Sequence, residues 1–255
     1  MCHPEIPAGQ SVPEVKAREV NLTVPTGESM TALLAEPEGP ARGAVLVIND
    51  VFGRSPFYEN LSRRLALAGF TALDPEYFFR QGPLAEQTRE AAFERRSRLD
   101  NQQALADLNA ALDWLQATTG FERLGTIGFC MGGTYVLQLA GRHRVSACFY
   151  GFPAQMSAEE RAAIKGPLIG FWGDQDAGVG MDNVEQLRTE LAGRGVEHDF
   201  TIYPGLGHGF MKASGLEPGG EGYDQACEAW TRTLDFYRGK LVATPAGKPR
   251  RRGGS

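Results

Sequence analysis

Residues 126–141, with the sequence TIGFCMGGTYVLQLAG, join an apolar run, a glycine-rich turn and a helical pattern. The turn places Cys130 between Gly128 and the pair Gly132 and Gly133. A cysteine that only fills a hydrophobic core needs no sharp bend, whereas a nucleophile presented above a sheet does. The other interpretation is a buried structural cysteine beside a glycine-lined packing site, and the turn by itself leaves both open.

The segments on either side of this stretch alternate between short apolar runs and amphipathic helical patterns. Buried strands are predicted at residues 43–50, 70–79, 123–130, 145–151, 167–176 and 197–205, and helices at 56–69, 133–141, 181–195 and 223–240. Residues 85–118 predict two helices that break near residues 99–101, and residues 18–24 and 30–36 predict two strands near one sheet edge. This alternation predicts an α/β fold, with a mostly parallel sheet and helices on both faces.

The composition is that of an ordinary globular chain of 255 residues, of which 42% are hydrophobic and 22% charged. A formal net charge of -5 gives no reason to expect a nucleic-acid or membrane partner. The first residues lack a basic region followed by an apolar core, and no run approaches the roughly 18 apolar residues of a membrane-spanning helix. The sequence therefore predicts a cytoplasmic protein.

The two ends of the chain differ from its middle. Residues 1–16 are polar and contain proline, which predicts an N-terminal arm before a single domain over residues 17–240. Residues 241–255 end in a short basic sequence that predicts a disordered tail. The four cysteines lack CxxC spacing and are expected to be free thiols. Adjacent Cys2 and His3 do not make a metal site, so neither a metal nor a cofactor is predicted.

The glycines around Cys130 have a steric role in this interpretation. The bend forces strained backbone angles on the nucleophile, and neighbours without a Cβ atom let the strand and the helix pack closely. The sulfur is then expected at the start of the following helix, whose positive end favours thiolate over thiol. The Met131 N–H points into the same space and is a candidate donor to an oxyanion.

A cysteine nucleophile needs a base and a group that orients the base. Among the four histidines, only His208 lies in a glycine-rich loop directly after a strand, in the sequence YPGLGHGF. Asp176 also follows a strand, in WGDQDAGV, where Asp174 is a competitor and a turn or helix-capping role is the alternative. The order Cys130, Asp176, His208 matches the nucleophile, acid and histidine order of α/β hydrolases.

On these motifs, the sequence resembles the dienelactone hydrolase family over roughly residues 18–237. GFCMGG corresponds to the nucleophile, GDQD to the acid and GHGF to the base. Two further stretches narrow the resemblance, NDVFG at residues 49–53 and DPEYFFRQG at residues 74–82. The resemblance implies an α/β-hydrolase fold and a monomer that acts on a small-molecule lactone or ester.

The resemblance also implies roles for residues in these two loops. In the first loop, the family has an acidic residue beside the nucleophile and a backbone N–H for the oxyanion, which match Asp50 and Val51. In the second, it has an arginine that holds the substrate carboxylate, which matches Arg80. The family's acidic residue is commonly glutamate, so the shorter Asp50 raises the question of whether it reaches the thiol proton.

A second departure from the family concerns substrate binding. Many members have another arginine four residues after the histidine, where this chain has Lys212. Lysine keeps the positive charge but loses the bidentate fork, so a relaxed or different acid substrate is expected. Phe79, beside Arg80, is expected to touch the substrate, with core packing as the alternative.

Together these features predict a hydrolase that opens a carboxylate-bearing lactone or an activated ester through a thioester acyl-enzyme on Cys130. An enol leaves easily, so a thiolate suffices as nucleophile, and little peptidase activity is expected. One alternative is a general carboxylesterase or thioesterase on the same fold. Another is a redox sensor in which Cys148 resolves an oxidised Cys130. A third is a catalytically inactive binding module whose pocket lacks an aligned His208.

Overall fold

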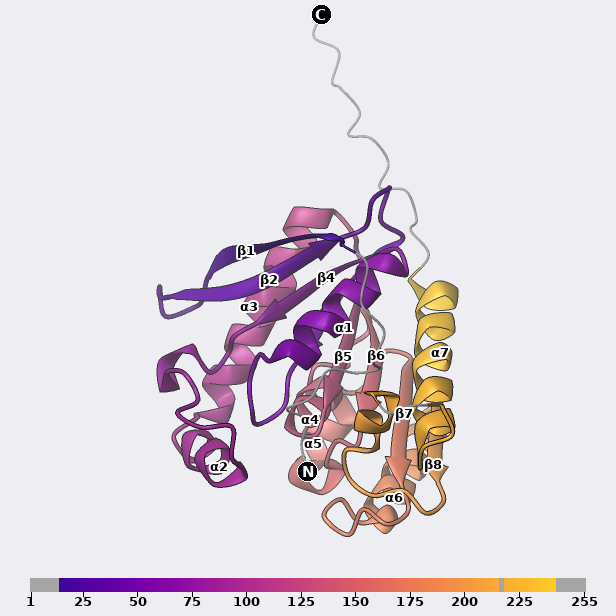
Figure 1. Cartoon of the computed structure of the whole chain (residues 1–255). Helices are drawn as coiled ribbons and strands as arrows, with labels where there is room; N and C mark the ends of the chain where they lie inside the picture. The colour runs from indigo at the N-terminus through magenta and orange to yellow at the C-terminus, as the bar shows by residue number, and fades with distance from the viewer. Residues whose placement is uncertain (1–13, 216–217, 242–255) are drawn as a thin grey trace, which may run out of the picture.

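The computed structural model describes residues 14–215 and 218–241. Within them lies one eight-stranded sheet with the strand order β1-β2-β4-β3-β5-β6-β7-β8 (Figure 1). The strands are β1 (Lys16–Thr23), β2 (Ser29–Glu36), β3 (Gly43–Ile48), β4 (Phe70–Pro75), β5 (Leu124–Phe129), β6 (Arg144–Phe149), β7 (Leu168–Gly173) and β8 (His198–Tyr203).

The sheet is antiparallel at one edge and parallel elsewhere. Strands β1 and β2 form an antiparallel pair, β2 pairs antiparallel with β4, and all later pairings are parallel. Every residue of β3, β4, β5 and β7 is buried. Their sequences are mostly apolar, because strands covered on both faces need no polar side.

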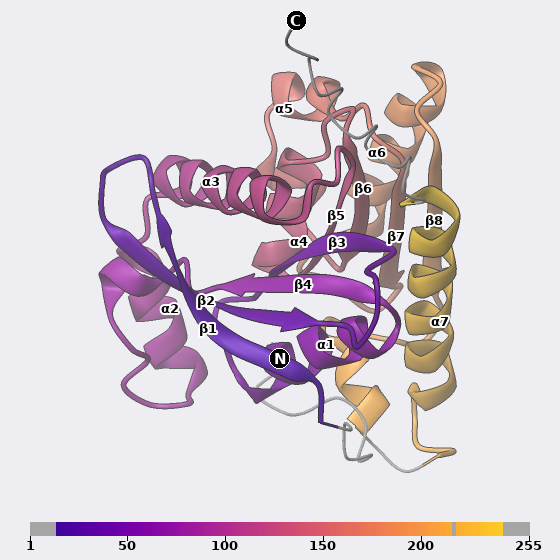
Figure 2. The same cartoon turned by 90° about the horizontal axis from the view of Figure 1, so that it is seen from above.

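Helices cover both faces of the sheet (Figure 2). One face carries α1 and α7, and the other carries α3, α4, α5 and α6. The helices are α1 (Pro56–Leu67), α2 (Arg89–Ser97), α3 (Asn101–Thr119), α4 (Met131–Gln138), α5 (Ala158–Ala163), α6 (Met181–Gly193) and α7 (Tyr223–Lys240), with short 3₁₀ turns at Phe79–Gln81, Pro153–Gln155 and Phe210–Gly215. Helix α2 stands apart from both layers, below the carboxyl end of β4 (Figure 1).

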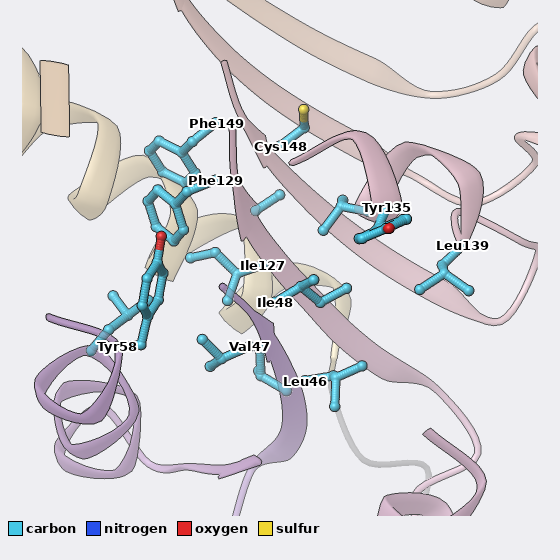
Figure 3. Packing of buried hydrophobic residues seen from close by; sticks show 14 of the residues in the cluster. Leu46, Val47, Ile48, Tyr58, Ile127, Phe129, Tyr135, Leu139, Cys148 and Phe149 are labelled. Carbon is cyan, nitrogen blue, oxygen red and sulfur yellow. The ribbon is translucent and has the colours of Figure 1, made fainter. Parts of the chain in front are cut away.

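An aromatic cluster fills the core beneath the end of β5 (Figure 3). The rings of Phe129 and Phe149 stack with centroids 4.6 Å apart, and Tyr58 from α1 meets Phe129 edge-on at 5.8 Å. Phe57 also meets Phe129 edge-on, at 5.5 Å. Such large buried rings hold the end of β5 rigidly, which matters because Cys130 is the next residue.

Most of the predicted elements are confirmed. The eight strands, the break between α2 and α3, and helix α7 lie where the sequence predicts them. Two points differ: α4 begins at Met131, two residues earlier than predicted, and α5 was not predicted. The predicted arm and tail lie largely outside the described residues, and β1 already begins at Lys16. Within the described part of the chain, no helix is long and apolar enough to cross a membrane.

Candidate active site

Cys130 occupies a strained turn between β5 and α4. Its φ of 55° and ψ of -119° lie outside the regions that ordinary L-residues adopt, and it is the N-cap residue of α4. A Cβ atom at Gly128 would clash with the Gly132 carbonyl, so the strand and helix meet this closely only because position 128 is glycine. Cys130 is 6% exposed, and its N–H donates to the Phe149 carbonyl at 3.0 Å.

Gly132 brings a second loop to the same place. A Cβ atom there would clash with the Ile48 carbonyl, at the end of β3, so the first turn of α4 lies directly against this strand. The order β4-β3-β5 also makes this the point where the chain connections diverge to opposite sides of the sheet. Clefts for ligands form at such switch points, at the carboxyl ends of the strands. The turn at residues 49–53 therefore lies beside Cys130.

Three buried side chains hold the turn at residues 49–53. The Asp50 N–H donates to the Tyr58 hydroxyl at 3.1 Å, and the Tyr77 hydroxyl donates to the Asn49 carbonyl at 2.7 Å. Arg95, on α2, donates to the Val51 carbonyl at 3.3 Å and lies over the Phe78 ring. The Val51 carbonyl therefore already has a hydrogen-bond donor within the protein, the Arg95 side chain.

Asp50 is fully buried in this turn. One of its carboxylate oxygens accepts a hydrogen bond from the Phe52 N–H at 2.9 Å, and its carbonyl accepts one from the Gly53 N–H at 3.0 Å. The carboxylate therefore caps its own turn as an Asx-type turn does. This contact places Val51 and Asp50 in one rigid unit beside the strained turn at Cys130, which is called the elbow below.

His208 and Asp176 form a pair. His208 Nδ1 lies 2.6 Å from Asp176 Oδ2, and the Asp176 side chain is 2% exposed. The other Asp176 oxygen accepts from the Val179 N–H at 3.2 Å, which fixes the carboxylate in place. The contact favours the imidazole tautomer protonated at Nδ1, with Nε2 on the opposite edge of the ring as the basic nitrogen.

The competing aspartate has a different role. Asp174 is exposed and accepts hydrogen bonds from the Gly205 N–H at 2.7 Å and from Gln175 Nε2 at 3.0 Å. It thereby joins the loop after β7 to the loop after β8 and leaves the histidine contact to Asp176.

Two aromatic rings pack on the imidazole of His208. Tyr150 meets it edge-on with centroids 4.9 Å apart, and Phe152 lies at 5.3 Å. Tyr150 has a φ of 39°, a second strained non-glycine residue, directly after β6. Strain of this kind persists only where the surroundings impose it, and here it presents the ring to His208.

A cavity of about 420 Å³ brings these groups together. It is lined by residues from the elbow, from α2 and from the loops after β6, β7 and β8, namely Arg89, Phe93, Cys130, Phe152, Gln155, Gln175, Asp176, Ala177, Gly178 and His208. Its size suits a small molecule, and its lining mixes aromatic walls with a few polar groups. The described residues contain no cluster of three or more side chains that would hold a metal.

The structure does not bring every predicted residue to this cavity. Six of the predicted residues are absent from its lining, namely Asp50, Val51, Phe79, Arg80, Met131 and Lys212. The Arg80 guanidinium contacts Asp107 at 2.5 Å and Glu28 at 2.6 Å, and it lies 4.3 Å from the centroid of the Phe79 ring. Because Asp107 is almost fully buried, its carboxylate needs this cation and draws it away from the cavity. Lys212 is exposed to solvent.

Four residues that line the cavity lie outside the motifs from which the site was predicted. They are Arg89, Phe93, Phe152 and Gln155. Arg89 and Phe93 are spaced i, i+4 on α2, which places both on one face of the helix. That spacing was visible in the sequence, but the direction in which α2 presents this face was not.

Buried ionisable groups lie behind the site. Burial raises the pKa of Asp74 well above its usual value, against a smaller opposing effect of the hydrogen bond from Asn49. Burial also raises the pKa of Glu76, and the neighbouring Arg95 opposes this shift. Cys148 is fully buried, and burial raises the pKa of its thiol to about 12. None of these three residues lines the cavity.

A strand–turn–helix elbow at the carboxyl edge of such a sheet, with a histidine–aspartate pair on later loops, defines an α/β hydrolase. A sequence model of the dienelactone hydrolase family matches residues 30–241. The chain therefore belongs to the dienelactone hydrolase family, whose members are hydrolases.

Individual relatives agree with this assignment. The chain is 28% identical over 257 residues to a carboxymethylenebutenolidase of Rhodococcus opacus, with 96% of this chain and 100% of the relative covered. A crystal structure named "Putative Dienelactone Hydrolase" from Klebsiella pneumoniae is similar with a TM-score of 0.75 and 26% identity, over 87% of this chain and 98% of that one. A dienelactone hydrolase-like promiscuous phosphotriesterase from metagenomic libraries shares the fold, with a TM-score of 0.72 at 20% identity, over 90% of this chain and 99% of that one.

Proposed function

We propose that this protein hydrolyses a small lactone or activated ester that carries a carboxylate, through a thioester acyl-enzyme on Cys130. The observation that carries the proposal is the single cavity that Cys130, His208 and Asp176 line together. The 2.6 Å contact between His208 Nδ1 and Asp176 supports a general base oriented by a carboxylate. The carboxymethylenebutenolidase name of the Rhodococcus opacus relative supports the lactone as substrate.

The first half of the reaction forms the acyl-enzyme. A base, either His208 or Asp50, takes the thiol proton, and the thiolate attacks the carbonyl carbon of the substrate. The oxyanion is stabilised by the N–H groups of Met131 and Val51. Met131 is the first residue of α4, so its N–H has no partner within the helix. A donor of this kind contributes on the order of 2.7–4 kcal/mol to transition-state stabilisation.

The first half ends when the carbon–oxygen bond of the lactone or ester breaks and the thioester forms. The enolate or alkoxide takes up the proton that the base removed from the thiol, and in a lactone it stays attached to the acyl group. The second half releases the acid. His208, oriented by Asp176, then removes a proton from water, and the resulting hydroxide attacks the thioester. The thiolate of Cys130 is expelled and the free carboxylic acid departs.

Turnover by a pair of variants tests the proposal. Rates are measured with dienelactone and p-nitrophenyl acetate for the wild type, Cys130→Ala and Cys130→Ser. Both substrates are expected to lose turnover in Cys130→Ala, whereas Cys130→Ser retains a hydroxyl and a residual rate. Unchanged rates in Cys130→Ala would refute the nucleophilic role of the sulfur.

A general carboxylesterase or thioesterase is the second candidate. The observation that favours it is the position of Arg80, whose pairing with Asp107 keeps it out of the cavity lining. Equal kcat/KM for matched neutral and anionic esters would support this candidate over a carboxylate-selective enzyme. Redox sensing has less support, because Cys148 is fully buried and its thiol contacts the Gly133 carbonyl.

A further inference from the structure

Arg89 is the first residue of α2 and reaches the rim of the Cys130 cavity. It is exposed, and its guanidinium carbon lies 5.3 Å from the centroid of the Phe93 ring, which lines the same cavity. Among the described lining residues, Arg89 is the one with a permanent positive charge. An aromatic ring that packs against the face of a guanidinium orients the guanidinium plane. The N–H groups at the edge of the guanidinium are left to bind an anion.

The carboxylates of the described residues leave Arg89 available for an anion. Salt bridges occupy Arg54, Arg80, Arg161 and Arg232, but within residues 14–215 and 218–241 none involves Arg89. The acidic side chain that shares the cavity, Asp176, is bound to His208. Arg80, by contrast, would have to leave a buried carboxylate unpaired before it could bind a substrate.

Helix α2 holds Arg89 at a fixed place relative to the nucleophile. Ala92 and Arg95 are its buried residues, and Arg95 donates to the Val51 carbonyl in the turn beside Cys130. The Thr88 side chain caps the helix by accepting from the Ala91 N–H at 3.3 Å. Arg89 is therefore positioned by the same element that contacts the candidate oxyanion loop.

We infer that Arg89, and not Arg80, binds the carboxylate of the substrate and makes the enzyme selective for anionic acyl groups. This inference rests on the proposed function and names the residue that sets its substrate class. Arg80 has a structural role, in which it ties α3 to the turn between β1 and β2 through Asp107 and Glu28. Phe93 and Phe152 provide the aromatic walls for the acyl group.

Two esters with the same leaving group and six-carbon acyl chains test this inference. The p-nitrophenyl monoester of adipic acid carries a carboxylate, and p-nitrophenyl hexanoate does not. Arg89→Gln is expected to raise KM for the adipate ester about tenfold, the loss of one charge-assisted contact, and to leave KM for the hexanoate within about twofold. Arg89→Lys keeps the charge and is expected to restore most of the affinity for the adipate ester.

Arg98→Gln is the matched control, because it removes the same charge from the exposed C-cap residue of the same helix. It is expected to change neither KM. Equal effects of Arg89→Gln on both esters, or a selective loss in Arg80→Gln instead, would overturn the inference and leave the hydrolase proposal standing. If Cys130→Ala hydrolyses both esters as fast as the wild type, the proposed function itself fails.

Discussion

At the scale of single residues, the loop after β7 places two aspartates in different roles. Asp176 is buried and contacts His208, whereas Asp174 is exposed and contacts the backbone of Gly205. A carboxylate that fixes the tautomer of a catalytic histidine affects the chemical step, and one that joins two loops does not. The pair therefore provides an internal comparison within one short loop.

Asp176→Asn is expected to lower kcat on the order of 10⁴-fold, because the amide no longer selects the productive tautomer of His208. KM is expected to change little, since the cavity keeps its shape. The measurement is steady-state hydrolysis of p-nitrophenyl hexanoate. Asp174→Asn is the control and is expected to retain nearly full activity; comparable losses in both variants would argue against the assignment of Asp176.

At the scale of elements, α2 connects the cavity rim to the turn that carries Val51. The face with Arg89 and Phe93 lines the cavity, and the buried Arg95 donates to the Val51 carbonyl at 3.3 Å and to the Gly82 carbonyl at 3.4 Å. Because the carbonyl of Val51 is bound by Arg95, the orientation of this turn depends on α2. Arg95 is thus a positioning residue for the candidate oxyanion donor.

Arg95→Lys is expected to lower kcat about tenfold to a hundredfold for neutral and anionic esters alike, because a small displacement of an aligned group is costly to the chemical step. Lysine keeps the charge beside Glu76 but does not span both carbonyls. KM and the rate of Cys130 alkylation by iodoacetamide are expected to stay as in the wild type, whereas a general loss of structure would change both. A rise in KM with kcat intact would contradict the positioning role.

At the scale of the whole molecule, a buried carboxylate couples stability to pH. Asp74 is the last residue but one of β4 and is fully buried. Asn49 Nδ2 donates to its Oδ1 at 3.2 Å, and its Oδ2 has no hydrogen-bond partner among the described residues. Its pKa is raised by burial, so the folded state binds the proton more tightly than the unfolded state. The stabilisation from this proton is full below the unfolded pKa, about 4, and is lost as pH rises toward the folded value.

Asp74→Asn removes this titration and keeps the acceptor for Asn49. The free energy of unfolding of the variant, relative to the wild type, is expected to increase as pH rises above about 4 and then to level off. Urea unfolding of both proteins over a pH series measures the difference. A constant difference across the series would show that Asp74 titrates alike in the folded and unfolded states.

The sequence predicted the architecture because its signals are local. Continuous apolar runs predict the buried strands, and the motif order predicts which loops hold the elbow, the acid and the histidine. Helix α5 was missed although its capping box, in which Ser157 and Glu160 exchange hydrogen bonds, is visible in the sequence. A helix of six residues has too short a periodic pattern to be distinguished from a loop.

The cavity lining could not be predicted to the same extent. The direction of Arg80 is decided by Asp107, which is 27 positions away and buried on α3, and by Glu28 in the β1–β2 turn. Where Arg89 points depends on how α2 docks on Val51 and Phe52, a packing that the helix pattern does not determine. Such contacts between distant segments are outside what periodicity and motif spacing can predict.

The central claim is that Cys130 carries the acyl group during turnover. The most direct measurement is the intact mass of His208→Gln, acid-quenched after mixing with p-nitrophenyl hexanoate, followed by peptide mapping. In any sample that has released p-nitrophenol, up to one hexanoyl group per chain is expected, mapped to Cys130 and absent from the double variant with Cys130→Ala, because deacylation needs the histidine base. An unmodified Cys130 in a variant that still releases p-nitrophenol, or an acyl group on another residue, would contradict the account.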